Sequence, residues 1–195
     1  MPNNDFNYAT ICGKLEDTFE YSHTDHDMDF FIGRVSVKRA SGVEDNIFII
    51  ASEELITDSM DKGTFIHVIG SLRSVSQVGT DGKSHLFIYV FANSICISET
   101  CEYINHFYLS ARVRNVHPIR ETPLGRIITD FTVIISRRRD ITIPCIAWES
   151  NAYLLQKMNC GDKIVLSGRL QSREYIKDDE PHEIREFSVY TVRKR

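Results

Sequence analysis

The stretch of sequence that decides the fold occurs twice, 98 positions apart. Residues 63–74 read GTFIHVIGSLRS, and residues 161–172 read GDKIVLSGRLQS. The two stretches share a glycine at the first and eighth positions, a leucine at the tenth and a serine at the twelfth. Matches at one constant offset predict a duplicated domain.

Further matches extend the repeat in both directions. Residues 11–15 and 109–113 both have apolar side chains at alternate sites, again 98 positions apart. Residues 50–53 match residues 146–149 at an offset of 96, as if one loop differed by two residues. We therefore predict an N-terminal domain over residues 1–103 and a C-terminal domain over residues 104–195.

The apolar pattern within each copy has a period of two, which is typical of strands. In the first copy the predicted strands include residues 30–37, 46–51, 64–72 and 86–92, and in the second they are residues 107–113, 128–135, 142–148, 163–170 and 186–192. A short helix-compatible segment precedes the fourth strand of each copy, at residues 52–60 and 150–158. Five strands with this helix are the order of an OB-fold, so we predict an all-β protein with short helices, built from two tandem OB-folds that are five-stranded Greek-key barrels. The alternative is a five-stranded meander that does not close.

The composition is that of a globular protein with a real core. Of the 195 residues, 42% are hydrophobic and 26% charged, which excludes disordered and low-complexity classes. No apolar stretch approaches the ~20 residues of a membrane helix, and no basic segment precedes an apolar run at the N-terminus. The five cysteines are scattered singly, as expected for reduced thiols, so we expect a cytoplasmic protein without membrane contact.

The net charge of −4 hides a division between the two copies. Residues 1–103 hold 7 lysines and arginines against 16 aspartates and glutamates, a net charge of −9. Residues 104–195 hold 16 basic against 11 acidic residues, a net charge of +5. Only the C-terminal copy is therefore suited to a polyanion, unless the division is chance clustering of solvated charge.

Several motifs carry a family resemblance. Residues 122–126 (TPLGR), 128–137, 143–148 (IPCIAW) and 168–175 (GRLQSREY) resemble the bacterial single-stranded DNA-binding protein family, especially a tandem OB-fold version common in Firmicutes. Residues 29–51 resemble the N-terminal copy of that version, so the likeness covers nearly the whole chain. The resemblance implies a non-catalytic protein that binds single-stranded DNA in replication, recombination or repair, together with replication or repair proteins.

Two aromatic residues are candidates for stacking on bases. Trp148, the single tryptophan, ends a strand in which Cys145 and Ala147 are expected to face the core, so its ring should point the other way. Tyr175 follows the basic residues Arg169 and Arg173, where the family also carries a stacking aromatic. Stacking contributes ~1–3 kcal/mol per base. The alternatives are a partly buried core tryptophan and a rim tyrosine packed on its hairpin.

Arginines of the second copy are candidates for phosphate contacts. Three adjacent ones, Arg137, Arg138 and Arg139, follow the predicted strand at residues 128–135. Arg112 and Arg114 alternate on the first strand and would share one face. For each of these arginines the alternative is a solvated surface charge.

The first copy departs from this pattern. Ser52 stands where the second copy has Trp148, and Ser76 and Gln77 stand near the positions that match Arg173 to Tyr175. Because its charge also opposes phosphate, we predict a mainly structural or pairing role for this copy. Family members commonly arrange four OB-folds around a strand, so a chain with two is expected to form a homodimer.

Catalytic chemistry is not indicated by the sequence. There is no glycine-rich phosphate loop, Gly-x-Ser-x-Gly turn or His-Glu-x-x-His pair, and His23 and His26 have no cysteine ligand at zinc-finger spacing. We therefore expect no catalytic residue, no metal and no cofactor. Two alternatives remain open: a primosome-type replication adaptor that works mainly through protein contacts, and an OB-fold module for oligosaccharides or nucleotides.

Overall fold

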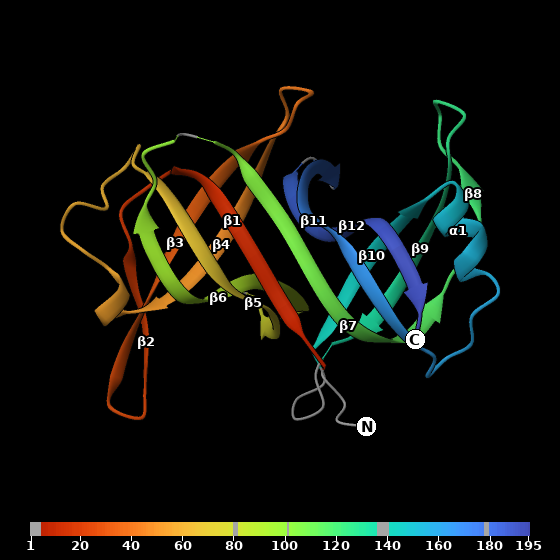
Figure 1. The fold of residues 1–195 in the computed structure, drawn as a ribbon, viewed down its shortest axis with the longest axis horizontal. Coiled ribbons are helices and arrows are strands. Elements are labelled where there is room, and N and C mark those ends of the chain that lie inside the picture. The colour runs from red at the N-terminus through yellow and green to blue at the C-terminus, as the bar shows by residue number, and fades with distance from the viewer. Residues whose placement is uncertain (1–4, 80–81, 101, 136–140, 178–179) are drawn as a thin grey trace. The chain divides into compact units, whose positions relative to one another are not determined.

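The computed structural model describes residues 5–79, 82–100, 102–135, 141–177 and 180–195, and within residues 174–182 it describes the backbone alone. Strands hold most of the described residues (Figure 1), which confirms the prediction of a mostly β protein. Across these ranges, no helix is long and apolar enough to cross a membrane.

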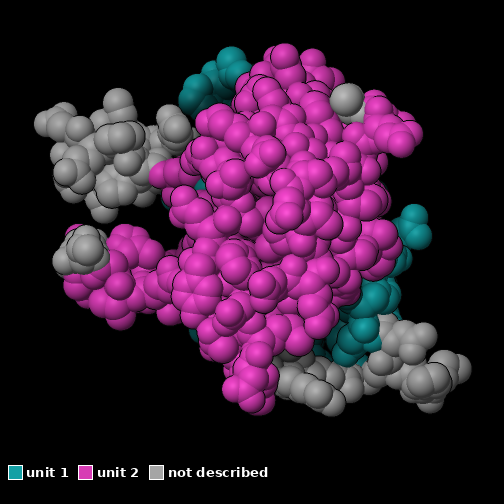
Figure 2. All heavy atoms as spheres, turned by 90° about the vertical axis from the view of Figure 1, so that its left-hand side faces the viewer, with its two compact units in different colours: residues 1–7, 107–171, 184–195 teal, residues 8–106, 172–183 magenta. Residues whose placement is uncertain are grey.

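The chain divides into two compact units, coloured separately in Figure 2. Unit 1 contains residues 1–7, 107–171 and 184–195, and unit 2 contains residues 8–106 and 172–183. Each unit therefore holds most of one sequence repeat together with a short segment from elsewhere in the chain. The predicted domains, residues 1–103 and 104–195, remain a prediction. In the structure, residues 1–7 and 172–183 are grouped with the other repeat.

Unit 2 is built on a closed circuit of strands. Its elements are β1 (Asn7–Leu15), β2 (Glu20–Asp25), β3 (Met28–Lys38), β4 (Glu44–Ser52), the 3-10 helix η1 (Glu53–Leu55), β5 (Phe65–Val78) and β6 (Ser84–Ile97). Neighbours pair in the order β2-β3-β4-β6-β5-β1, and β3 also pairs with β1. The β4–β6 pair is parallel, whereas the other pairs of this circuit are antiparallel.

Unit 1 repeats this arrangement. Its elements are β7 (Ile104–Val116), β8 (Arg120–Glu121), β9 (Ile127–Ile134), β10 (Thr142–Trp148), α1 (Ser150–Leu155), β11 (Lys163–Lys177) and β12 (Glu180–Lys194). The order is β7-β11-β12-β10-β9-β8, with an additional β7–β9 pairing that closes the circuit. Here the parallel pair is β10–β12. Strands β7, β9, β10, β11 and β12 therefore correspond to β1, β3, β4, β5 and β6.

The repeated glycines have a physical cause in both units. Gly63 and Gly161 have φ of 91° and 90°, in the left-handed region that favours glycine, just before β5 and β11. A Cβ on Gly70 would collide with the carbonyl oxygen of Phe91, and one on Gly168 with that of Ser188. The duplicated stretch thus preserves a turn and a close approach of two strands.

Apolar side chains at alternate positions of the strands form the core of each unit. In unit 1 the rings of Phe107 and Phe187, both fully buried, meet edge to face with centroids 5.9 Å apart. In unit 2, Ile11, Ile47 and Ile66 are fully buried on three different strands. This alternation is the period-two pattern of the sequence, and each predicted strand overlaps an observed one.

Cysteine side chains are free in the part of the chain that the structure describes. Cys12 and Cys145 are buried, while Cys96 and Cys160 are exposed. Burial, and after it the charge of Glu186, raise the pKa of the Cys145 thiol well above its usual value. Cys145 therefore stays protonated and belongs to the core.

A buried carboxylate holds the far segment of unit 2 in place. Asp45, at the start of β4, is 1% exposed and forms an ion pair with Arg39, whose Nε donates to Oδ2 at 2.8 Å. The amide of Ser172 donates to Oδ1 of Asp45 at 3.0 Å, and the Ser172 hydroxyl accepts from the amide of Asn46 at 2.9 Å. These bonds join residues that are 127 and 126 positions apart, and they attach the start of segment 172–183 to β4.

Replacing Asp45 by alanine is expected to lower the free energy of unfolding by about 2–3 kcal/mol, because the Arg39 guanidinium and the Ser172 amide lose their buried acceptor. The measurement is urea denaturation combined with amide exchange at Ser172, which should become faster. The matched control is Asp58→Ala, an exposed carboxylate in the same unit. An unchanged Ser172 exchange rate in Asp45→Ala would contradict the anchoring role.

Candidate nucleic-acid interface

Trp148 lies at the end of β10 and is half-buried. Its neighbours Cys145 and Ala147 are 2% and 0% exposed, respectively, and belong to the core. The indole Nε1 donates to the hydroxyl of Ser188 on β12 at 3.3 Å. The guanidinium of Arg126 lies 4.4 Å from the centre of the indole ring, within the range of a cation–π contact. A cation therefore lies over one face of the indole ring. The hydrogen bond to Ser188 fixes the orientation of the ring.

Arg126 is itself positioned by two local features. It follows Gly125, whose φ of 75° forms the turn before β9. Its Nε lies 3.5 Å from the Oε1 of Glu149, the residue after Trp148. The carboxylate and the indole together hold the guanidinium where β9 begins and β10 ends.

Arg169 and Tyr190 extend this surface across two more strands. Arg169 lies on β11 with its guanidinium carbon 5.8 Å from the Tyr190 ring centre, and its buried Nε has no hydrogen-bond partner. Tyr190 is 47% exposed on β12. Because Ile146 and Ser188 are partners in the parallel β10–β12 pair, Trp148 and Tyr190 each lie two residues further along, on the same face. We call Trp148, Tyr190, Arg126 and Arg169 the Trp148 face.

Arg112 and Arg114 are exposed at alternate positions of β7, as their spacing predicts. Arg114 donates from Nη1 to the hydroxyl of Thr142 at 3.0 Å. Arg112 pairs with Lys163, six residues along β11 from Arg169. At ~3.3 Å per residue this is a separation of about 20 Å, so these two arginines lie apart from the Trp148 face.

By contrast, Arg120 on β8 is neutralised locally. Its Nε donates to Oδ2 of Asp130 at 2.8 Å, and this bond raises the pKa of Arg120 above its usual value. Arg120 is therefore a poorer phosphate ligand than an arginine without a carboxylate partner.

The remaining candidates are only partly placed. Arg173 is exposed and directly follows Ser172, which Asp45 anchors. The backbone of Tyr175 lies in β11, but its side chain is outside the described residues. Arg137, Arg138 and Arg139 also lie outside them.

Unit 2 carries an aromatic row that the sequence comparison missed. Phe87, Tyr89 and Phe91 alternate on β6 with the buried Ile88 and Val90. The Phe87 ring lies 4.9 Å from that of Phe48 on β4 and 5.6 Å from that of Tyr89, and the guanidinium of Arg73 lies 3.6 Å from the centre of Phe91. The signal is present in the sequence as alternation in residues 86–91, but none of these aromatic residues stands at a position that matches Trp148 or Tyr175.

His23 and His26 lie on β2 and in the turn that follows it. Among the described side chains, no group of three or more histidine, cysteine, aspartate and glutamate residues is placed to hold a metal ion. The Nδ1 of His26 lies 2.8 Å from Oδ1 of Asp25 on an exposed turn, and His23 stacks on Phe30.

Comparison with known proteins gives a likeness in fold. No family model matches the sequence, and no curated protein matches it. The wild-type single-stranded DNA binding protein from Thermus aquaticus has a TM-score of 0.79 at 18% identity, with 98% of this chain and 93% of that chain covered. A deletion mutant of the same protein has a TM-score of 0.78 at 18% identity, with coverage of 98% and 95%. Over nearly its whole length, the chain therefore has the fold of these two structures.

Proposed function

We propose that the protein is a non-catalytic single-stranded DNA-binding protein made of two tandem OB-folds. The strand order supports this architecture, because each unit closes five strands with one parallel pair between the third and the fifth, as a Greek-key OB barrel does. The resemblance to the tandem version of Firmicutes and the fold shared with the Thermus aquaticus protein point the same way. Its setting would be replication, recombination or repair in the cytoplasm.

The Trp148 face is the observation that carries the proposal. Sequence-tolerant binding of a single strand needs flat rings for the bases and cations for the phosphates. Trp148 and Tyr190 supply two partly exposed rings, and Arg126 and Arg169 lie beside them. The positive charge of residues 104–195 supports the assignment of most DNA contacts to this copy, including those of Arg112, Arg114, Arg137, Arg138, Arg139, Arg173 and Tyr175.

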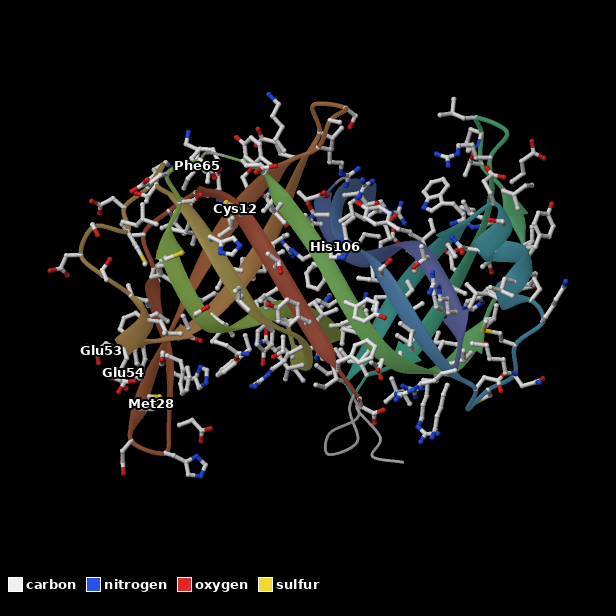
Figure 3. All side chains as sticks on the ribbon, viewed as in Figure 1. Cys12, Met28, Glu53, Glu54, Phe65 and His106 are labelled. Atoms are coloured by element: carbon white, nitrogen blue, oxygen red, sulfur yellow. The ribbon has the colours of Figure 1, made fainter. Side chains whose placement is uncertain are left out.

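A replication adaptor that works through protein contacts is the second candidate. It is favoured by an acidic surface around η1, where Glu53 and Glu54 extend outward in Figure 3. A hollow beside η1 combines apolar side chains such as Phe31 and Ile56 with the carboxylates of Asp58 and Asp61. Such a surface suits a basic protein partner and opposes DNA.

Binding of oligo-dT is expected to quench the fluorescence of Trp148, the single tryptophan, because a stacked base alters its surroundings. Trp148→Ala and Tyr190→Ala are each expected to weaken binding by ~1–3 kcal/mol, measured by anisotropy of labelled oligo-dT. The matched control is Tyr21→Ala, an exposed aromatic in the acidic copy at 59% exposure. Losses below a few tenths of a kcal/mol for both Trp148→Ala and Tyr190→Ala would refute stacking on this face.

We also propose a homodimer that assembles four OB-folds. The expected mass in light scattering at micromolar concentration is about 45 kDa, twice the 22.5 kDa chain, because symmetric pairing is the commonest form of homo-oligomer. A single-chain mass that persists across a tenfold range of concentration would show that the protein works as a monomer.

A further inference from the structure

A second basic site lies in a hollow of unit 1, away from the Trp148 face. Its polar lining consists of Ser110 and Arg112 on β7, Lys163 at the start of β11, Arg195 and Asp5. Ile134, Ile135 and Ile164 form an apolar wall. The lining side chains thus include three cations and one carboxylate.

Two of these cations face each other directly. Arg112 and Lys163 are cross-strand partners in the antiparallel β7–β11 ladder, so their side chains leave the sheet on the same side. Like charges in this position destabilise a sheet. Within the described ranges, neither side chain has an ion pair, whereas the neighbouring Lys194 binds Asp162 at 2.7 Å. Because this repulsion is uncompensated, the hollow attracts an anion.

Ser110 adds an independent observation. The residue is 6% exposed, and its buried hydroxyl has no hydrogen-bond partner. A buried polar group without a partner is costly and is rare in native structures. Ser110 is one of the residues that line the same hollow, and a hydroxyl can donate to a ligand oxygen.

Arg195 completes the site. Its amide donates to the carbonyl oxygen of Lys163 at 2.9 Å, which fixes this residue beside β11. Its guanidinium lies 3.3 Å from Oδ1 of Asp5. Asp5 is the one acidic side chain among the lining residues, so the lining side chains together keep a net positive charge.

We propose that this hollow is a phosphate-binding site in which Arg112, Lys163 and Arg195 supply charge and the Ser110 hydroxyl donates a hydrogen bond. A tetrahedral oxyanion offers enough acceptor oxygens for a guanidinium, an ammonium and a hydroxyl together. The phosphate comes either from the backbone of a bound single strand or from free phosphate. The first source rests on the proposed function, whereas the second does not.

Thermal unfolding of the full chain tests the site without DNA. In chloride buffer, Lys163→Gln is expected to raise the melting temperature, because it removes the repulsion from Arg112. The matched control Lys157→Gln removes an exposed cation elsewhere in unit 1 and should leave it unchanged. Inorganic phosphate at matched ionic strength should raise the melting temperature of the wild type more than that of the double variant Arg112→Gln/Lys163→Gln.

The variant Ser110→Ala distinguishes a site with a defined hydrogen-bond donor from a surface that only carries positive charge. This variant keeps every charge and removes a hydroxyl without a partner, so its stability in chloride should be unchanged or higher. Its stabilisation by phosphate should nevertheless be smaller than that of the wild type. Equal stabilisation in both would mean that the hydroxyl contacts no ligand, and it would overturn the site as described.

The salt dependence of oligo-dT binding identifies the source of the phosphate. If the strand's backbone occupies the hollow, the slope of log K against log salt should fall by ~0.7 for each cation removed, and Lys157→Gln should not change it. An unchanged slope together with phosphate stabilisation assigns the hollow to free phosphate. Failure of oligo-dT to bind at all refutes the proposed function but leaves the thermal test intact. If the variants change neither measurement, the phosphate site is refuted.

Discussion

The architecture of both units depends on one parallel contact, between β4 and β6 and between β10 and β12. Parallel neighbours cannot be joined by a tight hairpin, so the chain must return to the opposite end of the strands before it can form the parallel pair. In each unit η1 or α1 and the following strand make that crossing. The crossing strand closes against the first strand of its unit, and its glycine lets the backbone of the fifth strand approach closely. Once these contacts form, the inward and outward faces of every strand are fixed.

The fixed faces explain which parts of the fold were predictable. The buried strands were accessible from sequence because a side chain that alternates between core and surface leaves a period of two. Strand β2 was missed because its six residues are all exposed, so they carry no apolar alternation. The two-residue strand β8 is too short to carry a pattern. The grouping of residues 172–183 with unit 2 was also inaccessible, because it involves long-range contacts such as the hydrogen bond between Ser172 and Asp45, which are 127 positions apart.

The sequence indicated which types of residue form the candidate interface, but not which residues contact one another there. Trp148 and Arg169 were expected from motifs within one strand. Arg126 and Tyr190 were missed because their roles arise between strands, where β9, β10, β11 and β12 place them beside those residues. The net charge of a whole copy was a similarly coarse guide to where positive charge is available. Arg120, Arg126 and Lys194 have carboxylate partners, while Arg112 and Lys163 face each other, so the available positive charge is concentrated at a few positions.

The restraint on Trp148 bears on how such a surface would bind a flexible strand. Binding costs the free energy of ordering both partners, and a ring that is already fixed loses less entropy than a mobile one. The bond to Ser188 and the Arg126 guanidinium fix the indole, and the Glu149 carboxylate fixes Arg126 in turn. Because Arg126 lies over one face of the ring, a base must stack on the opposite face or displace the guanidinium. In the first case the cation stays close to the base and its phosphate. In the proposed complex the ring and the cation would act as one preorganised unit, and Glu149, the acidic residue that follows the tryptophan, would support binding despite its charge.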